Sequence, residues 1–522
     1  MSMNDYWGAL RSTVQRTVDA GRIGRPVALR LTVHVGGGTS AAEACRTALR
    51  AMAAGWFGSE PAGGHCVGGD GAPSVEALRW AGGQSALLAV SAGPGPTAPT
   101  GGNLALMGSN GTLYHEIGGA AADIGVAFEA PLPAADGRAA GDGGTARYGV
   151  VAVGGNRTHL EGYARTFAAD PRCELKAVAD QPGLPEYREG LNRLLAAELE
   201  VPYLPLEQAL ALDGVDIAIN CADVERRAPV ARAILEAGKH LYTDKPLAGT
   251  REAAREIAAA AAAAGVTTQM FTQVWSDWGQ RARAAIDQGV TGPVQALHCD
   301  MLMAKGKPGT APPERRRERP GDGRFTFVAA KRELFDMGVY PIALVQWLSG
   351  RRVAEVYAMT GNYFFAEHAA LDLEDYGALA LRLDDGRVAS ICCGRIGATS
   401  HPRMGEQRIT LIGERGIFTF SDASPRLEVY DDQPPFTAPP VHPFDPMQMW
   451  SSSQRDIQPR PKDRWVPLAA GAADADACAF LDCIDRGRRP QVTVADAVHH
   501  VDVILAGYES AVSGKPVALT RQ

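Results

Sequence analysis

The feature that most constrains the fold is a regular alternation of strand-like and helix-like segments between residues 147 and 272. Short apolar runs predict strands, and stretches with a helical period lie between them. The predicted strands are Tyr148–Val153, Leu175–Ala179, Val215–Asn220, His240–Thr243 and Thr267–Phe271, and the predicted helices include Pro229–Ala237 and Arg251–Ala264. Such alternation is typical of a doubly wound parallel sheet. We therefore predict an α/β domain over residues 147–272.

From about residue 273 the pattern changes, because strand-like runs follow one another with few helices between them. These runs are Val294–Met303, Val353–Thr360, Gly377–Leu383 and Arg387–Cys392. A succession of this kind is typical of a mainly antiparallel sheet. We predict that residues 273–522 form an α+β domain.

The first 135 residues contain a weak internal repeat of this α+β segment. Two short blocks match at constant offsets and in the same order: Asp19, Gly21, Gly24, Ala28 and Leu29 with Asp287, Gly289, Gly292, Ala296 and Leu297, and Leu106, Gly108 and Gly111 with Leu411, Gly413 and Gly416. We predict that residues 1–135 form an additional α+β sheet domain, a degenerate and catalytically empty copy of the later one. The small, glycine-rich segment 136–146 would be the linker. Chance similarity is the alternative, since glycine is frequent in this chain.

A glycine-rich turn follows the first predicted strand of the α/β domain. It retains only the middle glycine of the G-x-G-x-x-G fingerprint, the position at which the backbone touches a pyrophosphate. The candidate cofactor-binding residues in this turn are Gly154, Gly155, Asn156 and Arg157.

Asp180 closes the second predicted strand, where a carboxylate accepts hydrogen bonds from the hydroxyls of an adenosine ribose. The residues that follow it, Gln181-Pro182-Gly183, offer no arginine to bind a 2′-phosphate. The turn and the carboxylate together predict a Rossmann dinucleotide site that favours NAD over NADP. The alternative is a glycine-rich turn that binds nothing and an Asp180 that is only a solvated turn residue.

The segment 237–248, AGKHLYTDKPLA, resembles the AGKHV…EKPLA segment of the Gfo/Idh/MocA oxidoreductases, a family that includes glucose-fructose oxidoreductase and inositol dehydrogenase. The segment 336–340, DMGVY, is similar to the family's D-x-G-x-H/Y motif, and the resemblance covers about residues 147–518. Two departures stand out: Asp244 replaces the usual glutamate, and 221–226, CADVER, replaces T-P-x-x-x-H.

The resemblance implies the function of several residues around these motifs. Its further cofactor-binding residues would be Cys221, Ala222, Asp244, Lys245 and Pro246, and the bond between the last two would be cis. It also implies a Rossmann half that holds NAD and a sheet half, residues 273–522, that forms the substrate site and the contacts between subunits.

The chemistry of alcohol oxidation suggests a role for three residues. The reaction needs a hydride acceptor, a base for the hydroxyl proton and positive charge near the transient alkoxide. We expect Lys245 to supply the charge, Asp336 to orient substrate or lysine, and Tyr340 to act as general acid/base. Because the pKa of tyrosine is about 10, Lys245 would have to lower it. Alternatively, Asp336 only makes a cap or salt bridge and Tyr340 only packs.

The residues and the resemblance together predict an NAD-dependent dehydrogenase that acts on a CH–OH group of a sugar, polyol or sugar derivative. Two alternatives stay open: an NAD-dependent, redox-assisted glycoside lyase or hydrolase, and a non-catalytic NAD-binding regulatory subunit. Cofactor retention and substrate-dependent reduction of the nicotinamide distinguish the three.

Composition excludes several other classes of partner. The formal net charge of −7 gives no field that would attract nucleic acid or an anionic membrane. The nine cysteines have no CxxC or Cys/His zinc spacing, so we expect neither a metal nor a disulfide framework. We also expect a cytoplasmic protein whose N-terminal domain packs on the C-terminal sheet, and we leave a homodimer open.

Overall fold

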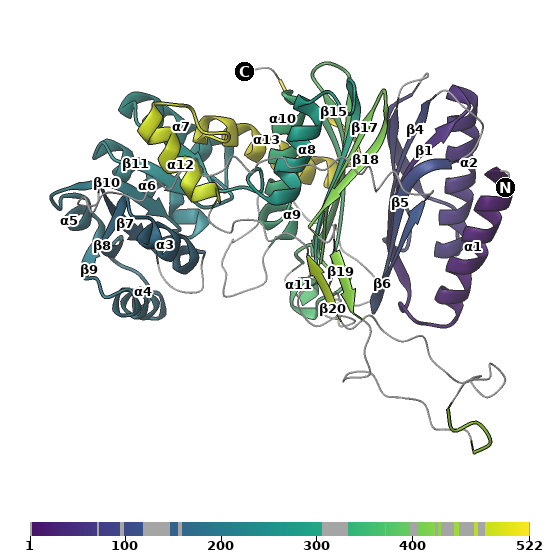
Figure 1. Cartoon of the computed structure of the whole chain (residues 1–522), viewed down its shortest axis with the longest axis horizontal. Coiled ribbons are helices and arrows are strands. Elements are labelled where there is room, and N and C mark those ends of the chain that lie inside the picture. Colours follow the sequence, from purple (N-terminus) through teal and green to yellow (C-terminus); the bar gives the residue numbers. More distant parts are fainter. Residues whose placement is uncertain are drawn as a thin grey trace.

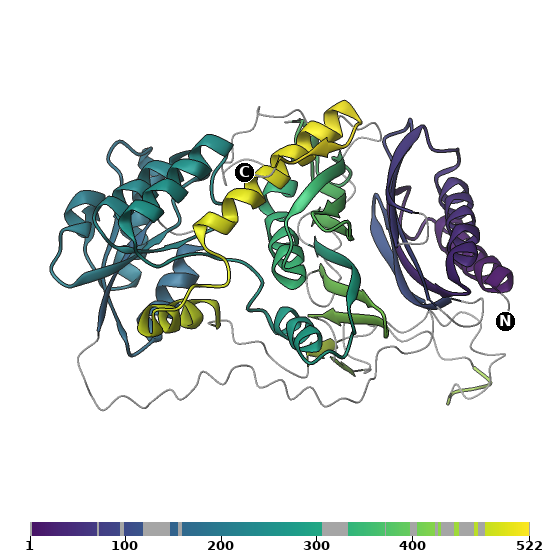
Figure 2. The same cartoon turned by 90° about the horizontal axis from the view of Figure 1, so that it is seen from above.

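The computed structural model describes residues 3–69, 73–93, 99–117, 147–154, 159–304, 332–370, 372–396, 405–422, 426–429, 443–447, 464–467 and 475–520. These residues form three sheets of six or seven strands and one short two-stranded sheet. The three large sheets lie in a row, with the α/β domain at one end, the C-terminal sheet in the middle and the N-terminal sheet at the other end (Figures 1 and 2).

The α/β domain contains a six-stranded parallel sheet. In chain order its elements are β7 (Tyr148–Val153), α3 (Leu160–Ala169), β8 (Cys173–Asp180), α4 (Glu186–Glu198), β9 (Tyr203–Pro205), α5 (Leu206–Leu210), β10 (Val215–Asn220), α6 (Val224–Glu236), β11 (His240–Thr243), α7 (Arg251–Ala264) and β12 (Thr268–Met270). The strands lie in the order β12-β11-β10-β7-β8-β9 with parallel neighbours. This is the strand order of a Rossmann fold, so the predicted fold class is confirmed.

The predicted bounds agree closely with the structure where apolar runs end at glycine or polar residues. Strands β7, β10 and β11 have the predicted ends, and so does helix α7, which begins after the cap residue Thr250 and ends before the cap residue Gly265. Helix α6 differs, because it begins at Val224 rather than at Pro229. The helix already begins after Asp223 and contains Pro229 in its interior.

The C-terminal domain is built on a seven-stranded mixed sheet. Its elements are α8 (Asp277–Asp287), β13 (Val294–Met303), α9 (Glu333–Asp336), α10 (Val339–Ser349), β14 (Val353–Gly361), α11 (Ala366–Ala370), β15 (Tyr376–Leu383), β16 (Val388–Arg395), β17 (Gly405–Gly413), β18 (Gly416–Ser421), β19 (Arg426–Val429), β20 (Arg464–Pro467), α12 (Ala475–Arg486), α13 (Val494–Ser513) and β21 (Val517–Ala518). The strand order is β18-β17-β13-β16-β15-β14-β21, and only β13 and β16 pair in parallel.

The N-terminal domain has the same topology as the C-terminal sheet. Its elements are α1 (Met3–Asp19), β1 (Pro26–Gly36), α2 (Gly38–Phe57), β2 (Gly63–Gly68), β3 (Ser74–Arg79), β4 (Ser85–Gly93), β5 (Pro99–Gly108) and β6 (Gly111–Ile117). The order β2-β3-β4-β1-β5-β6 corresponds strand for strand to β14-β15-β16-β13-β17-β18, and the central pair β1 and β4 is parallel like β13 and β16.

The two domains share irregularities as well as topology. A register shift lies between Pro26 and Ala28 opposite β5, and another lies between Val294 and Ala296 opposite β17. Gly24 and Gly292 precede these strands with φ of +68° and +63°. We propose on this basis that the first domain is a duplicated copy of the later one. The end of the predicted domain, 118–135, and the predicted linker, 136–146, lie outside the described residues.

The two related sheets pack face to face, and their helices cover the outer faces (Figure 1). Alternation along β1 explains this arrangement, because Leu29 and Leu31 pack under the helices while Ala28 and Arg30 point to the other sheet. Buried apolar side chains of both sheets form one continuous core between them. The N-terminal domain therefore packs on the C-terminal sheet, as predicted.

A buried ion pair joins the central strands of the two sheets. Arg30 of β1 donates to Asp300 of β13, and both side chains are at most 5% exposed. We expect Arg30→Met to lower the free energy of unfolding by about 3 to 5 kcal/mol, because it leaves a buried carboxylate without its partner. Chemical denaturation checks this value. The double variant Arg30→Met/Asp300→Leu should recover most of the loss, and an Arg30→Met protein as stable as the parent would contradict the expectation.

Candidate functional site

The carboxyl ends of the parallel strands bring several predicted cofactor residues to one edge of the α/β sheet. Strands β7 and β10 are neighbours there although they are not consecutive, and such switch points hold dinucleotides. Gly154 follows β7 with φ +114°, and a Cβ at this position would lie 3.1 Å from the carbonyl oxygen of Cys221. The glycine thus allows the close backbone approach that a pyrophosphate needs, and the site fits NAD. Gly155, Asn156 and Arg157 lie outside the described residues.

The loop after β10 places Cys221 and Ala222 beside Gly154. Both are buried, and the Ala222 N–H donates to Asn220 Oδ1 at 3.1 Å. Burial raises the pKa of the Cys221 thiol well above its usual value. The thiol is therefore neutral, and this residue contributes packing and backbone to the site rather than charge.

Asp180 lies at the end of β8, but its carboxylate is buried and already bound. Oδ1 accepts from the Gln181 N–H at 2.8 Å and from Arg226 Nη1 at 2.9 Å, and Oδ2 accepts from Asn192 Nδ2 at 3.0 Å. The prediction that no arginine lies near Asp180 considered only the residues that follow it directly in the sequence. The arginine that reaches this carboxylate comes instead from the first turn of α6.

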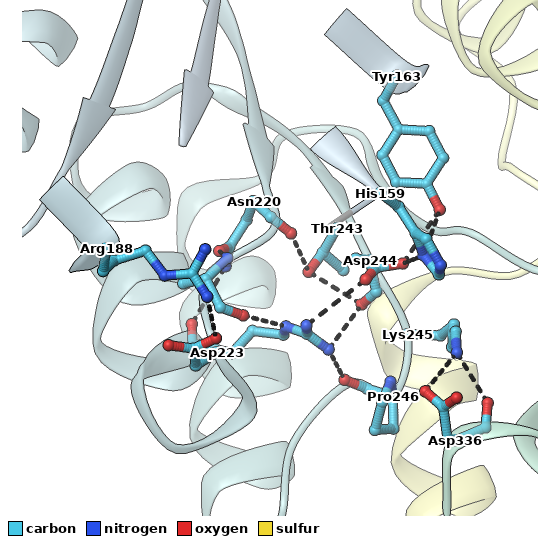
Figure 3. Close-up of polar contacts among 12 residues, drawn as sticks. His159, Tyr163, Arg188, Asn220, Asp223, Thr243, Asp244, Lys245, Pro246 and Asp336 are labelled. Atoms are coloured by element: carbon cyan, nitrogen blue, oxygen red, sulfur yellow. Dashed lines mark hydrogen bonds and ion pairs between the residues drawn. The ribbon is translucent and has the colours of Figure 1, made fainter. Parts of the chain in front are cut away.

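Asp244 is the centre of a hydrogen-bonded cluster at the end of β11 (Figure 3). Oδ1 is 2.9 Å from His159 Nδ1 and accepts from the Tyr163 hydroxyl at 3.0 Å, while Arg227 Nη2 lies 3.7 Å from Oδ2. Burial by itself would raise the pKa of Asp244, but His159, Arg227 and Lys245 outweigh it and hold the pKa below its usual range. Asp244 is therefore a fixed anion, as the usual glutamate would be.

The cluster continues into the Lys245–Pro246 peptide bond, which is cis as the resemblance implied. Arg227 donates to the carbonyl oxygens of Asp244 and Pro246, on either side of Lys245. The backbone of the lysine is thereby fixed from the α/β domain. No sequence motif pointed to His159, Tyr163 or Arg227, because their partners lie far away along the chain.

Lys245 and Asp336 meet between the α/β domain and the C-terminal domain (Figure 3). Lys245 Nζ donates to Asp336 Oδ1 at 2.7 Å and to the Asp336 carbonyl oxygen at 2.8 Å. The two side chains are 2% and 11% exposed. The prediction that these residues come together thus agrees with their positions, and the salt bridge of Asp336 is made with the predicted lysine itself.

Arg395, at the end of β16, holds Asp336 from the opposite side. Arg395 Nη2 donates to Asp336 Oδ2 at 3.0 Å, and Nε donates to Glu333 Oε1 at 2.7 Å. Each oxygen of Asp336 therefore has its own cation, Lys245 or Arg395. Arg395 was not predicted to be a catalytic or cofactor-binding residue, since its contact with Asp336 depends on the pairing of β16 within the sheet.

Tyr340 lies in the first turn of α10, after a break at Gly338 that separates it from α9 and Asp336. Lys245 Nζ is over its ring, 4.9 Å from the centroid. Burial first, and then the carboxylates of Asp244 and Asp336, raise the pKa of Tyr340 well above its usual value. The expectation that Lys245 lowers this pKa is wrong, because the ammonium lies on the ring face and two carboxylates lie nearby.

The described residues contain neither a cluster of metal ligands nor a membrane-spanning helix. Within the ranges given above, no group of three or more histidine, cysteine, aspartate or glutamate side chains could hold a metal ion. In the same part of the chain, no helix combines the length and the apolar character needed to cross a membrane.

Comparison with protein families matches both halves of the chain that contain the site. Residues 149–272 match a model described as oxidoreductase family, NAD-binding Rossmann fold, and residues 280–419 match a model described as the GFO/IDH/MocA C-terminal domain. Among curated proteins, an uncharacterized oxidoreductase, YrbE of Bacillus subtilis, is 21% identical over 281 residues, which are 53% of this chain and 74% of that protein.

Solved structures with the same fold include several dehydrogenases. GenD2 from gentamicin A biosynthesis, solved in complex with NAD, is 24% identical with a TM-score of 0.54, over 72% of this chain and 97% of that one. A scyllo-inositol dehydrogenase from Lactobacillus casei, with bound NAD(H) and scyllo-inositol, is 18% identical with a TM-score of 0.53, over 71% and 98% of the two chains. A putative myo-inositol dehydrogenase from Sinorhizobium meliloti 1021 is 18% identical with a TM-score of 0.53, over 72% and 100%.

Proposed function

We propose that this chain, which belongs to the Gfo/Idh/MocA oxidoreductases and binds NAD, transfers a hydride between the nicotinamide and a secondary alcohol of a sugar, polyol or sugar derivative. The observation that carries the proposal is the buried pair of Lys245 and Asp336. One member comes from the end of the NAD-binding sheet and the other from the C-terminal domain, so the two charges meet where cofactor and substrate would meet. NAD, when bound, supplies the hydride acceptor at its nicotinamide ring.

The charges of this pair suit the oxidation of an alcohol. The carboxylate of Asp336 would take the O–H proton of the substrate, and bound NAD would supply the acceptor for the hydride of the same carbon, so that the alcohol would become a ketone. The Lys245 ammonium stabilises the negative charge that develops on the oxygen during this step. Arg395 keeps Asp336 in place when Lys245 turns its hydrogen bond toward the substrate oxygen.

Tyr340 has a supporting role in this proposal. Because its pKa is raised, the phenol keeps its proton and serves as a neutral hydrogen-bond donor to the substrate oxygen. Tyr340→Phe should lower kcat/KM by about 10-fold, the value of one hydrogen bond, without changing the shape of its pH profile. Steady-state rates between pH 6 and 10 test this. If the substitution removes an ionisation from the profile, the tyrosine is the base instead.

The proposed function is tested by offering the purified protein NAD and a panel of polyols. We suggest myo-inositol and scyllo-inositol first, because dehydrogenases of these compounds share the fold. We expect substrate-dependent formation of reduced nicotinamide. Turnover of a glycoside without net NADH would favour redox-assisted lyase or hydrolase chemistry, and NAD binding without turnover of any alcohol or glycoside would favour a regulatory subunit.

A further inference from the structure

The group that faces solvent at the end of β8 is a guanidinium rather than a carboxylate. The Asp180 side chain has no exposed surface, whereas Arg226, which donates to it at 2.9 Å, is 25% exposed. A dinucleotide that extends its adenosine ribose toward Asp180 therefore meets Arg226 first.

Arg226 is held in this position by a second carboxylate. Its Nη2 lies 3.5 Å from Asp223 Oδ2, and the buried Arg188 donates to Oδ1 of the same Asp223 at 3.1 Å (Figure 3). Two carboxylates and two guanidiniums thus alternate at the ends of β8 and β10. The charge of Asp180 is already balanced within this cluster. Its partner Arg226 is 25% exposed, and Asp223, the second partner of Arg226, is 23% exposed.

The chemistry of a guanidinium fits a phosphate better than a hydroxyl. Arginine only donates hydrogen bonds, and its planar fork matches phosphate oxygens in a bidentate manner. An unpaired aspartate would repel a 2′-phosphate, but here the carboxylate lies beneath Arg226. We propose that Arg226 provides a subsite for the 2′-phosphate of NADP, so that the chain accepts NADP as well as NAD. The proposal rests on the dinucleotide site of the proposed function, and not on its hydride chemistry.

NAD binding is compatible with the same arrangement. Asp180 accepts three hydrogen bonds, from Gln181, Arg226 and Asn192, of the roughly four that a carboxylate can accept. Because the Asp180 side chain has no exposed surface, a ribose hydroxyl of NAD would accept from the partly exposed Arg226 rather than reach the carboxylate. Discrimination between the cofactors then depends on Arg226 rather than on Asp180 alone.

Calorimetric titration of the full chain with four probes tests the proposal: NAD, NADP, 5′-AMP and 2′,5′-ADP. In the parent protein we expect the Kd of NADP to lie within about 10-fold of that of NAD, and 2′,5′-ADP to bind more tightly than 5′-AMP. Arg226→Gln should raise the Kd of NADP and 2′,5′-ADP by about 10- to 100-fold and change that of NAD and 5′-AMP by less than about 3-fold. Arg193→Gln, which removes an exposed arginine of α4, is the matched control and should change none of them.

Two results would overturn the proposal. One is a parent protein that binds NAD more than about 1,000-fold more tightly than NADP, and the other is an Arg226→Gln protein with an unchanged Kd for NADP. Where Arg226→Gln does not fold, the parent ratio and Arg226→Lys decide: the lysine keeps the charge but loses the fork, so it should weaken NADP binding more than NAD binding. Normal NAD binding without alcohol oxidation contradicts only the proposed reaction.

Discussion

Lys245→Ala should lower kcat for alcohol oxidation by about 1,000-fold or more while changing the Kd of NAD by less than about 10-fold. The ammonium is the group that donates to Asp336 from the α/β side, and it is buried, so bulk water cannot replace its charge. Once it is removed, the developing charge on the substrate oxygen has no neighbouring cation from this domain. The remaining structure is less affected, since Arg395 still neutralises Asp336.

The measurement is single-turnover formation of reduced nicotinamide, combined with NAD titration to separate binding from chemistry. Lys245→Met is a useful second variant, because it keeps most of the apolar stem of the side chain and tests whether packing alone explains the loss. Lys239→Ala is the matched control, because it removes a lysine that donates only to the carbonyl oxygen of Val215. Single-turnover rates for Lys245→Met close to those of the parent would show that the ammonium has no part in the chemistry.

The α/β domain could be predicted from sequence because its signals are local. Buried parallel strands are continuous apolar runs, and glycine or a polar residue ends each of them. This gave the bounds of β10 and β11 and placed Asp244 and Lys245 at a strand end. The contact between Lys245 and Asp336 was expected from the chemistry of alcohol oxidation, since nothing in the periodicity relates residues 91 positions apart.

The parts of the site that could not be predicted are long-range pairs and their effect on ionisation. Arg226 and Asp180 are 46 positions apart, and only the parallel arrangement of β8, β7 and β10 brings them together. The pKa of Tyr340 depends on burial and on the carboxylates that surround it, and neither is visible in the spacing of a motif. The direction of that shift therefore had to come from the structure.

The repeat of the C-terminal sheet in the N-terminal domain could be recognised mainly from its glycines. Gly24 and Gly292 are both in the left-handed region and lie against the turns between β5 and β6 and between β17 and β18, so a Cβ would strain the backbone in either domain. These positions keep their residue in both copies, and that is why a weak repeat could be found. Side chains facing the other sheet match less well, since Ala28 corresponds to Ala296 but Arg30 corresponds to His298 in the aligned blocks.

A chain that lacks residues 1–146 should self-associate, whereas the full chain should not use this face for association. Removing the N-terminal domain exposes an apolar surface that includes the buried side chains Tyr357, Met359, Tyr376, Ile412 and Ile417. Large contiguous apolar surfaces are seldom left in contact with water, and a second copy of the truncated chain offers the same face. The truncated chain is expected to fold, because 71–72% of this chain is enough to cover 97–100% of the related dehydrogenase structures.

Analytical ultracentrifugation of the full and truncated chains measures this difference. Ile417→Glu in the truncated chain should restore the monomer, because it places a charge within the exposed face. Lys239→Glu, which introduces the same side chain on the α/β domain, should have no effect. In the full chain Ile417 lies against Gly101 of the N-terminal sheet, so the same substitution should destabilise it instead. A truncated chain that stays monomeric at high concentration would show that the first domain does not replace a subunit at this face. The N-terminal domain would then contribute only to the stability of the folded chain.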